Sequence, residues 1–234
     1  MNIDLILEKI LKKYGSRISD STALEEITEK LKKGVATYAD AYTGAQETGK
    51  ILTDLFREYL PSVLVDGQMP KDVASMIIKP SMLKAGEDVS DLTAQIQKQL
   101  NEKASIGMNP IIPEQNEDQI DGIIDYASGL DDFEAHEENV LDMVEHQYES
   151  QVDDFVHDNA EFHYQCGLSP KIERVSSGKC CAWCDGLVGT YEYSEVRNTG
   201  NDVFRRHKNC HCVVLYNPAN GSKNRQNVHT KKWV

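Results

Sequence analysis

The chain has 234 residues, 40% of them hydrophobic, and a mean hydropathy of −0.51, which fits one large globular domain or two small ones. It contains no apolar run of about eighteen residues, so we expect no membrane contact. Its first residues lack the apolar segment of a signal peptide, which predicts synthesis in a reducing cytoplasm. The formal net charge of −13 at pH 7 disfavours nucleic acid as the main partner.

The first hundred residues show helical spacing of apolar side chains, interrupted by glycine, proline and capping residues. Thr22 and Glu25 have the spacing of a capping box, which indicates that a second helix begins there. The sequence predicts helices over residues 3–14 (ended by Gly15), 22–33, 37–60 (ended by Pro61), 70–78 (stopped by Pro80) and from Ser90 or Asp91 to just before Gly107.

The middle of the chain is uniformly acidic. Residues 104–170 contain 17 acidic residues and no lysine or arginine. After a proline-containing linker at 107–116, we expect a helix over 117–127 and a long amphipathic helix over about 131–165. The simplest interpretation of this charge is a set of solvated helix faces.

One acidic stripe on the long helix repeats every four residues: Glu145, Glu149, Asp153, His157 and Glu161. Carboxylates and histidine at this spacing can bind a divalent metal between helices, but such sites need a matching Glu-x-x-His set on a partner helix. The chain contains no Glu-x-x-His, so we expect this stripe to face solvent.

The charge and the periodicity both change near residues 166–171. Residues 171–234 carry 11 basic against 5 acidic residues, and strands are predicted at 172–175, 187–193 and 213–216. We therefore predict a mainly α fold with an elongated helical N-terminal region (1–106), an acidic helical region (117–165) and a small α+β zinc-binding module with a basic polar tail (166–234).

Five potential zinc ligands lie in this last region: Cys181, Cys184, His207, Cys210 and Cys212. The first two form a Cys-x-x-Cys pair, the others read His-x-x-Cys-x-Cys, and 22 residues separate the two groups. Two such pairs brought together by a hairpin supply the four corners of a tetrahedral zinc site. In a reducing compartment clustered cysteine and histidine favour a metal, with unmetallated thiols and disulfide or redox chemistry as the alternatives.

The spacing alone leaves the exact ligand set open. Cys181, Cys184 and Cys210 are the firmest candidates, while His207 and Cys212 compete for the fourth corner. His211 alternates with its cysteine neighbours and should face away from them in an extended segment.

Catalytic signatures are missing from the sequence. It contains no Gly-x-Ser-x-Gly, Walker or dinucleotide-binding motif, so we predict no enzyme. Five candidates for four zinc corners favour a closed, structural zinc over a catalytic one with an open position.

A set of longer motifs extends around these ligands: DNAEF at 158–162, GLSPKIER at 167–174, CCAWC at 180–184, GTYEY at 189–193, DVFRRHKNCHC at 202–212 and RQNVHTKKW at 225–233. Over about residues 155–233 the chain thereby resembles the C-terminal module of tailed-phage minor head proteins, the head-morphogenesis family named after the F protein of phage Mu. Upstream, only YADAY at 38–42 and Asp66-Gly67 resemble that family. Where the family usually has arginine between its last two cysteines, this chain has His211.

The resemblance implies a non-enzymatic virion protein, inside the capsid or at the portal vertex, that acts in head morphogenesis or DNA delivery. It implies structural Zn²⁺ at Cys181, Cys184, His207 and Cys210, with Cys212 as the alternate. The implied partners are the portal protein, the major capsid protein or both, and the basic tail adds a nucleic-acid contact. A zinc-dependent nuclease or host-directed effector is the alternative, and a DNA-binding regulator is a third class.

Overall fold

The computed structural model describes residues 2–176, 178, 181–198, 202–207 and 210–218. The described elements are α1 (Ile3–Asp20), α2 (Thr22–Lys32), α3 (Tyr38–Tyr59), the 3-10 helix η1 (Leu60–Val63), α4 (Lys71–Lys103), α5 (Glu117–Ser128), α6 (Phe133–Gln165), β1 (Lys171–Val175), α7 (Ala182–Asp185), β2 (Gly189–Glu192), α8 (Tyr193–Val196) and β3 (Val213–Asn217). The prediction of a mainly helical protein with a small α+β C-terminal part is confirmed.

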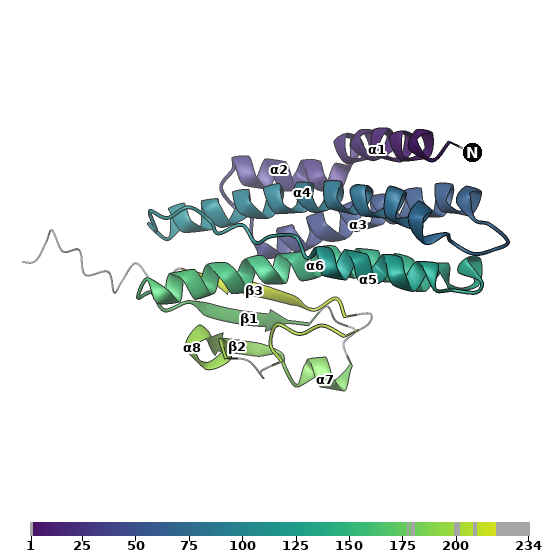
Figure 1. The fold of residues 1–234 in the computed structure, drawn as a ribbon. Helices are drawn as coiled ribbons and strands as arrows, with labels where there is room; N and C mark the ends of the chain where they lie inside the picture. Colours follow the sequence, from purple (N-terminus) through teal and green to yellow (C-terminus); the bar gives the residue numbers. More distant parts are fainter. Residues whose placement is uncertain (1, 177, 179–180, 199–201, 208–209, 219–234) are drawn as a thin grey trace, which may run out of the picture.

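The long helices lie side by side with nearly aligned axes, and the sheet lies along one side of α6 (Figure 1). Helices α3, α4 and α6 pack against one another, α1 covers α3 and α4, and α5 covers α4 and α6. The two 33-residue helices, α4 and α6, are each about 50 Å long. None of the helices in the described ranges combines the length and apolar character needed to cross a lipid bilayer.

Two helix ends predicted from single residues are wrong. Helix α1 continues through Gly15 to Asp20, because an exposed glycine inside a helix costs only about 1 kcal/mol. Helix α4 continues through Pro80, so the two short helices expected around it are one. Proline removes a backbone hydrogen bond, but Ile77, Ile78 and Met82 on either side of it are fully buried and keep the helix on the core.

Other helix boundaries follow the predicted capping chemistry closely. Helix α2 begins one residue earlier than the capping box predicted at Thr22 and Glu25, because Ser21, and not Thr22, is its N-cap and accepts from the Leu24 amide. It ends before Gly34, whose φ of +69° is the left-handed conformation that favours glycine. A capping box formed by Thr37 and Asp40 starts α3.

The three strands form an antiparallel sheet in the order β2-β1-β3. In the central strand, Ile172 pairs with Tyr191 on one side and Tyr216 on the other. Strand β2 is shorter than predicted because Tyr193 already begins α8. Strand β3 contacts α3 and α6, which attaches the sheet to the bundle.

The hydrophobic core continues from the bundle into the sheet. Ile172, Val214 and Tyr216 belong to the same buried cluster as Val152 and Phe155 of α6. The predicted boundary near 166–171 coincides with the end of α6, where Gly167 has a φ of +81°. The division into regions 1–106, 117–165 and 166–234 stays a prediction, because a shared core does not show whether the parts fold separately.

Candidate metal centre

The Cys-x-x-Cys pair forms the first turn of α7. Cys181 is the N-cap of this helix, and its sulfur lies 3.5 Å from the Cys184 backbone nitrogen, which donates to it. A helical turn therefore brings the second thiol back beside the first, as the two-residue spacing predicts. Cys184 is 1% exposed, whereas Cys181 is exposed at the surface.

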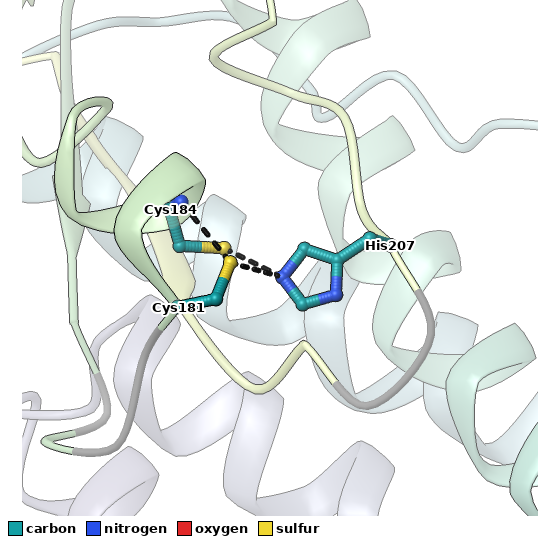
Figure 2. Close-up of side chains that lie close together, drawn as sticks. All are labelled: Cys181, Cys184 and His207. Carbon is teal, nitrogen blue, oxygen red and sulfur yellow. Dashed lines mark hydrogen bonds between the residues drawn. The ribbon is translucent and has the colours of Figure 1, made fainter.

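His207 comes from the loop before β3 and points its Nε2 atom at both sulfurs (Figure 2). The Nε2 atom lies 3.2 Å from Cys181 Sγ and 3.0 Å from Cys184 Sγ. The ring of Trp183 packs edge-on against the imidazole, with 5.6 Å between centroids. These three donor atoms lie within 4.8 Å of one another.

Cys210 and Cys212 approach the same sulfur from the buried side. Cys210 Sγ lies 3.5 Å from Cys184 Sγ, and both later cysteines are 2% exposed. The thiols of Cys184, Cys210 and Cys212 form a second group within 4.8 Å. All five predicted ligands therefore converge, as two triads that share Cys184.

Sulfur and nitrogen donors together suit a metal ion of borderline softness such as Zn²⁺. Around tetrahedral zinc, sulfur and nitrogen ligands lie about 3.5–3.8 Å apart, close to the separations of 3.0–3.5 Å found here. One thiol of the second triad has to rotate toward His207 to close a tetrahedron around the first triad. The Cys/His clusters could therefore hold a metal ion, with Cys184 at their centre.

A buried arginine that the sequence analysis missed lies behind the sulfurs. Arg174, 1% exposed on β1, directs Nη2 at Cys210 Sγ (3.5 Å) and Cys184 Sγ (3.8 Å), while its Nη1 donates to the Val203 carbonyl oxygen. A guanidinium here would offset the negative charge of thiolates that bind a metal ion. The only sequence signal was an arginine at an inward-facing position of a short alternating strand.

The thiols of Cys181, Cys184 and Cys210 differ in the direction of their pKa shifts. Hydrogen bonding from the Cys184 backbone lowers the pKa of Cys181. Burial raises the pKa of Cys184 to about 12. For Cys210 burial acts in the same direction, but the Cys212 backbone, the Cys184 thiol and two arginines outweigh it and lower the pKa. A metal cation at this position would take the place of the Cys184 proton.

The prediction that the acidic stripe of α6 faces solvent is wrong for its central members. Glu149 and Asp153 are 2% and 4% exposed, and Arg206, whose side chain is 9% exposed, lies between them. Arg206 Nη1 lies 3.2 Å from Glu149 Oε2, and Nη2 lies 3.0 Å from Asp153 Oδ1. Glu145 accepts from the Thr53 hydroxyl at 2.8 Å, and Glu161 pairs with Arg197. The basic partners Arg206 and Arg197 come from the C-terminal region, so the burial of Glu149 and Asp153 results from long-range folding, which helical periodicity does not report.

Arg206 also positions the metal centre. Its Nη1 atom donates to the Cys210 carbonyl oxygen at 3.0 Å, and it directly precedes His207 in the chain. Asp153 accepts from the Tyr42 hydroxyl, which in turn accepts from the Val214 amide at 3.2 Å. This network connects α3, α6 and β3 beside the sulfurs.

The remaining predicted features lie apart from the cluster. His211 points to α6, with Nδ1 3.1 Å from Glu149 Oε1, on the side of the segment opposite to the buried cysteines. Cys166 is exposed at the C-terminal cap of α6. Cys180 and most of the basic tail, with the predicted nucleic-acid contact, lie outside the described residues.

Comparison of the chain with protein-family models, with curated proteins and with solved structures finds no match.

Proposed function

We propose that this protein is a minor head protein of a tailed phage, located in the capsid interior or at the portal vertex, and that a structural Zn²⁺ ion stabilises its C-terminal module. One observation carries the proposal. The two halves of the motif on which the family resemblance rests are 22 residues apart in the sequence and meet at Cys184, beside a small sheet on a helical bundle.

A structural role for the zinc is supported by the burial and composition of the donors. Three of the four thiols are 1–2% exposed, and Arg174 lies against two of them. A catalytic zinc keeps a position open to water or substrate, whereas thiolate-rich sites with four protein ligands are closed. A nuclease or effector function has no comparable support from the geometry.

The bundle determines which surface is left for a partner. The apolar stripe of α6 around Val144, Tyr148 and Val152 is fully covered by the other helices. This stripe is therefore not available to a partner. Several carboxylates of α5 and α6 pair with basic residues of α3 and α4, as in the bonds of Lys79 to Glu117 and Asp121.

Other carboxylates of these two helices stay exposed, Asp118 and Glu134 among them. An exposed acidic surface attracts a basic partner, and salt at about 0.1 M and above screens that attraction. We propose that this surface contributes to contact with the portal or the major capsid protein.

The test is co-expression with the portal and major capsid proteins of the same phage, followed by affinity capture at low and high salt. We expect capture of at least one of them, weakened by high salt and by the Asp118→Asn/Glu134→Gln variant. The Glu25→Gln/Glu26→Gln variant removes two exposed carboxylates of α2 and serves as the matched control. Recovery of nucleic acid without either protein would contradict the proposal and favour a DNA-binding function.

A further inference from the structure

A second cluster of metal-ligand residues lies on the other side of the segment that carries Cys210 and Cys212. It consists of His146 and Glu149, one helical turn apart on α6, and His211, which precedes β3. One ligand atom from each residue lies within 4.8 Å of the others. We propose that these three side chains bind a second divalent transition-metal ion, an inference that does not depend on the proposed function.

The hydrogen bonding of His146 prepares one of its nitrogens for a metal. Its Nδ1 atom lies 2.7 Å from the Asp142 carbonyl oxygen, which can only accept, so Nδ1 carries the proton. The lone pair of the neutral ring is then on Nε2. This atom is buried and has no hydrogen-bond partner among the described residues. Metal-binding histidines commonly donate their other N–H to a carbonyl oxygen in this way.

Glu149 is held in place as a ligand would be. Its Oε1 atom accepts from Gln46 Nε2 at 2.6 Å, and its Oε2 atom lies 3.2 Å from Arg206 Nη1. The 3.1 Å between Oε1 and His211 Nδ1 is close to the roughly 3.3 Å that separates nitrogen and oxygen ligands of tetrahedral zinc. The centroids of the two imidazole rings lie 5.3 Å apart.

The local charge also favours a cation. Glu149 and Asp153 carry two formal negative charges; Arg206 pairs with both, and Arg174 also acts electrostatically on Asp153. A metal ion would place positive charge beside the Glu149 carboxylate without protonating His211. An ion pair between protonated His211 and Glu149 is the competing explanation of the same contact.

The donors indicate which metal binds. Two imidazoles and one carboxylate suit Zn²⁺, Co²⁺ or Ni²⁺, whereas Mg²⁺ and Ca²⁺ prefer oxygen ligands throughout. Three protein ligands leave a fourth position for water or an incoming side chain. Glu149 and His211 line a cavity of about 700 Å³, and His146 lines a separate one.

The test is titration of metal-free, full-length protein with Co²⁺, following both the bound cobalt and the thiolate-to-cobalt charge-transfer absorption. We expect two bound equivalents in the wild type, one with the thiolate band and one without it. His146→Gln and His211→Gln should each lose the equivalent without the band. His136→Gln, which changes an exposed histidine of the same helix, should keep both.

The outcomes separate this site from the cysteine cluster. Cobalt uptake accompanied entirely by the thiolate band, with the same stoichiometry in all variants, would overturn the second site. Uptake without the band that disappears in both variants would support it even if the cysteine cluster bound no metal. His211 is half exposed, so the His211→Gln variant carries the test if His146→Gln does not fold.

Discussion

Helices α3, α4 and α6 bury a different kind of side chain from the segment between β1 and β3. The bundle buries long series of aliphatic and aromatic residues, such as Leu52, Ile77 and Val152. The C-terminal segment contributes few buried apolar residues and instead buries three thiols and the Arg174 guanidinium. Apolar burial of about 25 cal/mol per Å² can stabilise a bundle of this size, but a short three-stranded sheet has too little apolar area for that. The sheet is therefore attached through its contact with the bundle, and we propose that metal ligation at the cysteine cluster stabilises it further.

The largest expected effect comes from removing the central thiol. Structural zinc sites contribute on the order of 10 kcal/mol to folding, so Cys184→Ser, or a strong chelator, should unfold the segment from β1 to β3. We expect loss of amide hydrogen-exchange protection in the strands, with protection retained in α3, α4 and α6. Cys166→Ser, at an exposed cysteine, is the control. Retained strand protection after complete metal removal would show that the sheet needs no metal.

Substitution of Arg206 should have the next largest effect on stability. Arg206→Leu leaves Glu149 and Asp153 buried without their cation, which costs about 3–5 kcal/mol. Arg205→Leu, at an exposed neighbour, should change the free energy of unfolding by less than about 0.5 kcal/mol. Urea unfolding of both variants measures the difference. Adding Glu149→Gln and Asp153→Asn to Arg206→Leu should restore much of the loss, and no recovery would mean that charge burial is not the cause.

A smaller effect is expected at the hydroxyl that joins bundle and sheet. Tyr42→Phe removes the donor to Asp153 and leaves the buried Val214 amide without its acceptor, at a cost of about 1–3 kcal/mol. Tyr126→Phe changes a tyrosine that is 38% exposed and should be nearly neutral. Equal stability of the two variants by thermal unfolding would contradict the connection between α3 and β3.

The smallest effect is expected at a partly exposed ion pair between α6 and the residue after α8. Hydrogen bonds from Arg197 lower the pKa of Glu161 from 4.5 to about 2. A carboxyl group whose pKa is lower in the folded protein than in the unfolded chain stabilises the fold at pH values above its unfolded pKa. This contribution to stability is lost as the pH falls toward the folded pKa of about 2. Glu161→Gln should therefore cost about 0.5–1 kcal/mol at pH 7 and nothing near pH 2. Glu173→Gln, outward-facing on β1, should show no such pH dependence, and a constant difference across this range would exclude the ion pair as the cause.

Local signals in the sequence were sufficient for most elements. The series of apolar residues predicted α6 and α5 within two or three residues, and the expected capping box located the start of α2 within one residue. The Cys-x-x-Cys and His-x-x-Cys-x-Cys spacings identified donors that the fold brings together. These predictions hold because helical periodicity, capping and ligand turns depend on residues only a few positions apart.

Signals that depend on distant partners were misread or missed. Pro80 was expected to end a helix, but the core contacts on both sides of it continue α4. Arg174 lies behind the sulfurs and Arg206 lies between two carboxylates. Predicting either position would have required knowledge of which elements pack together. No local pattern reports that.

The sequence by itself therefore determined the helical class of the protein, the position of its small sheet and the cysteine and histidine donors. Only the tertiary structure decided that Glu149 and Asp153 are buried, that Arg206 lies between them and that His211 lies beside His146. The physical reason is that burial and charge pairing are properties of the packed chain. A carboxylate on a helix is solvated or buried according to the segment that packs over it, and here that segment is more than fifty residues away.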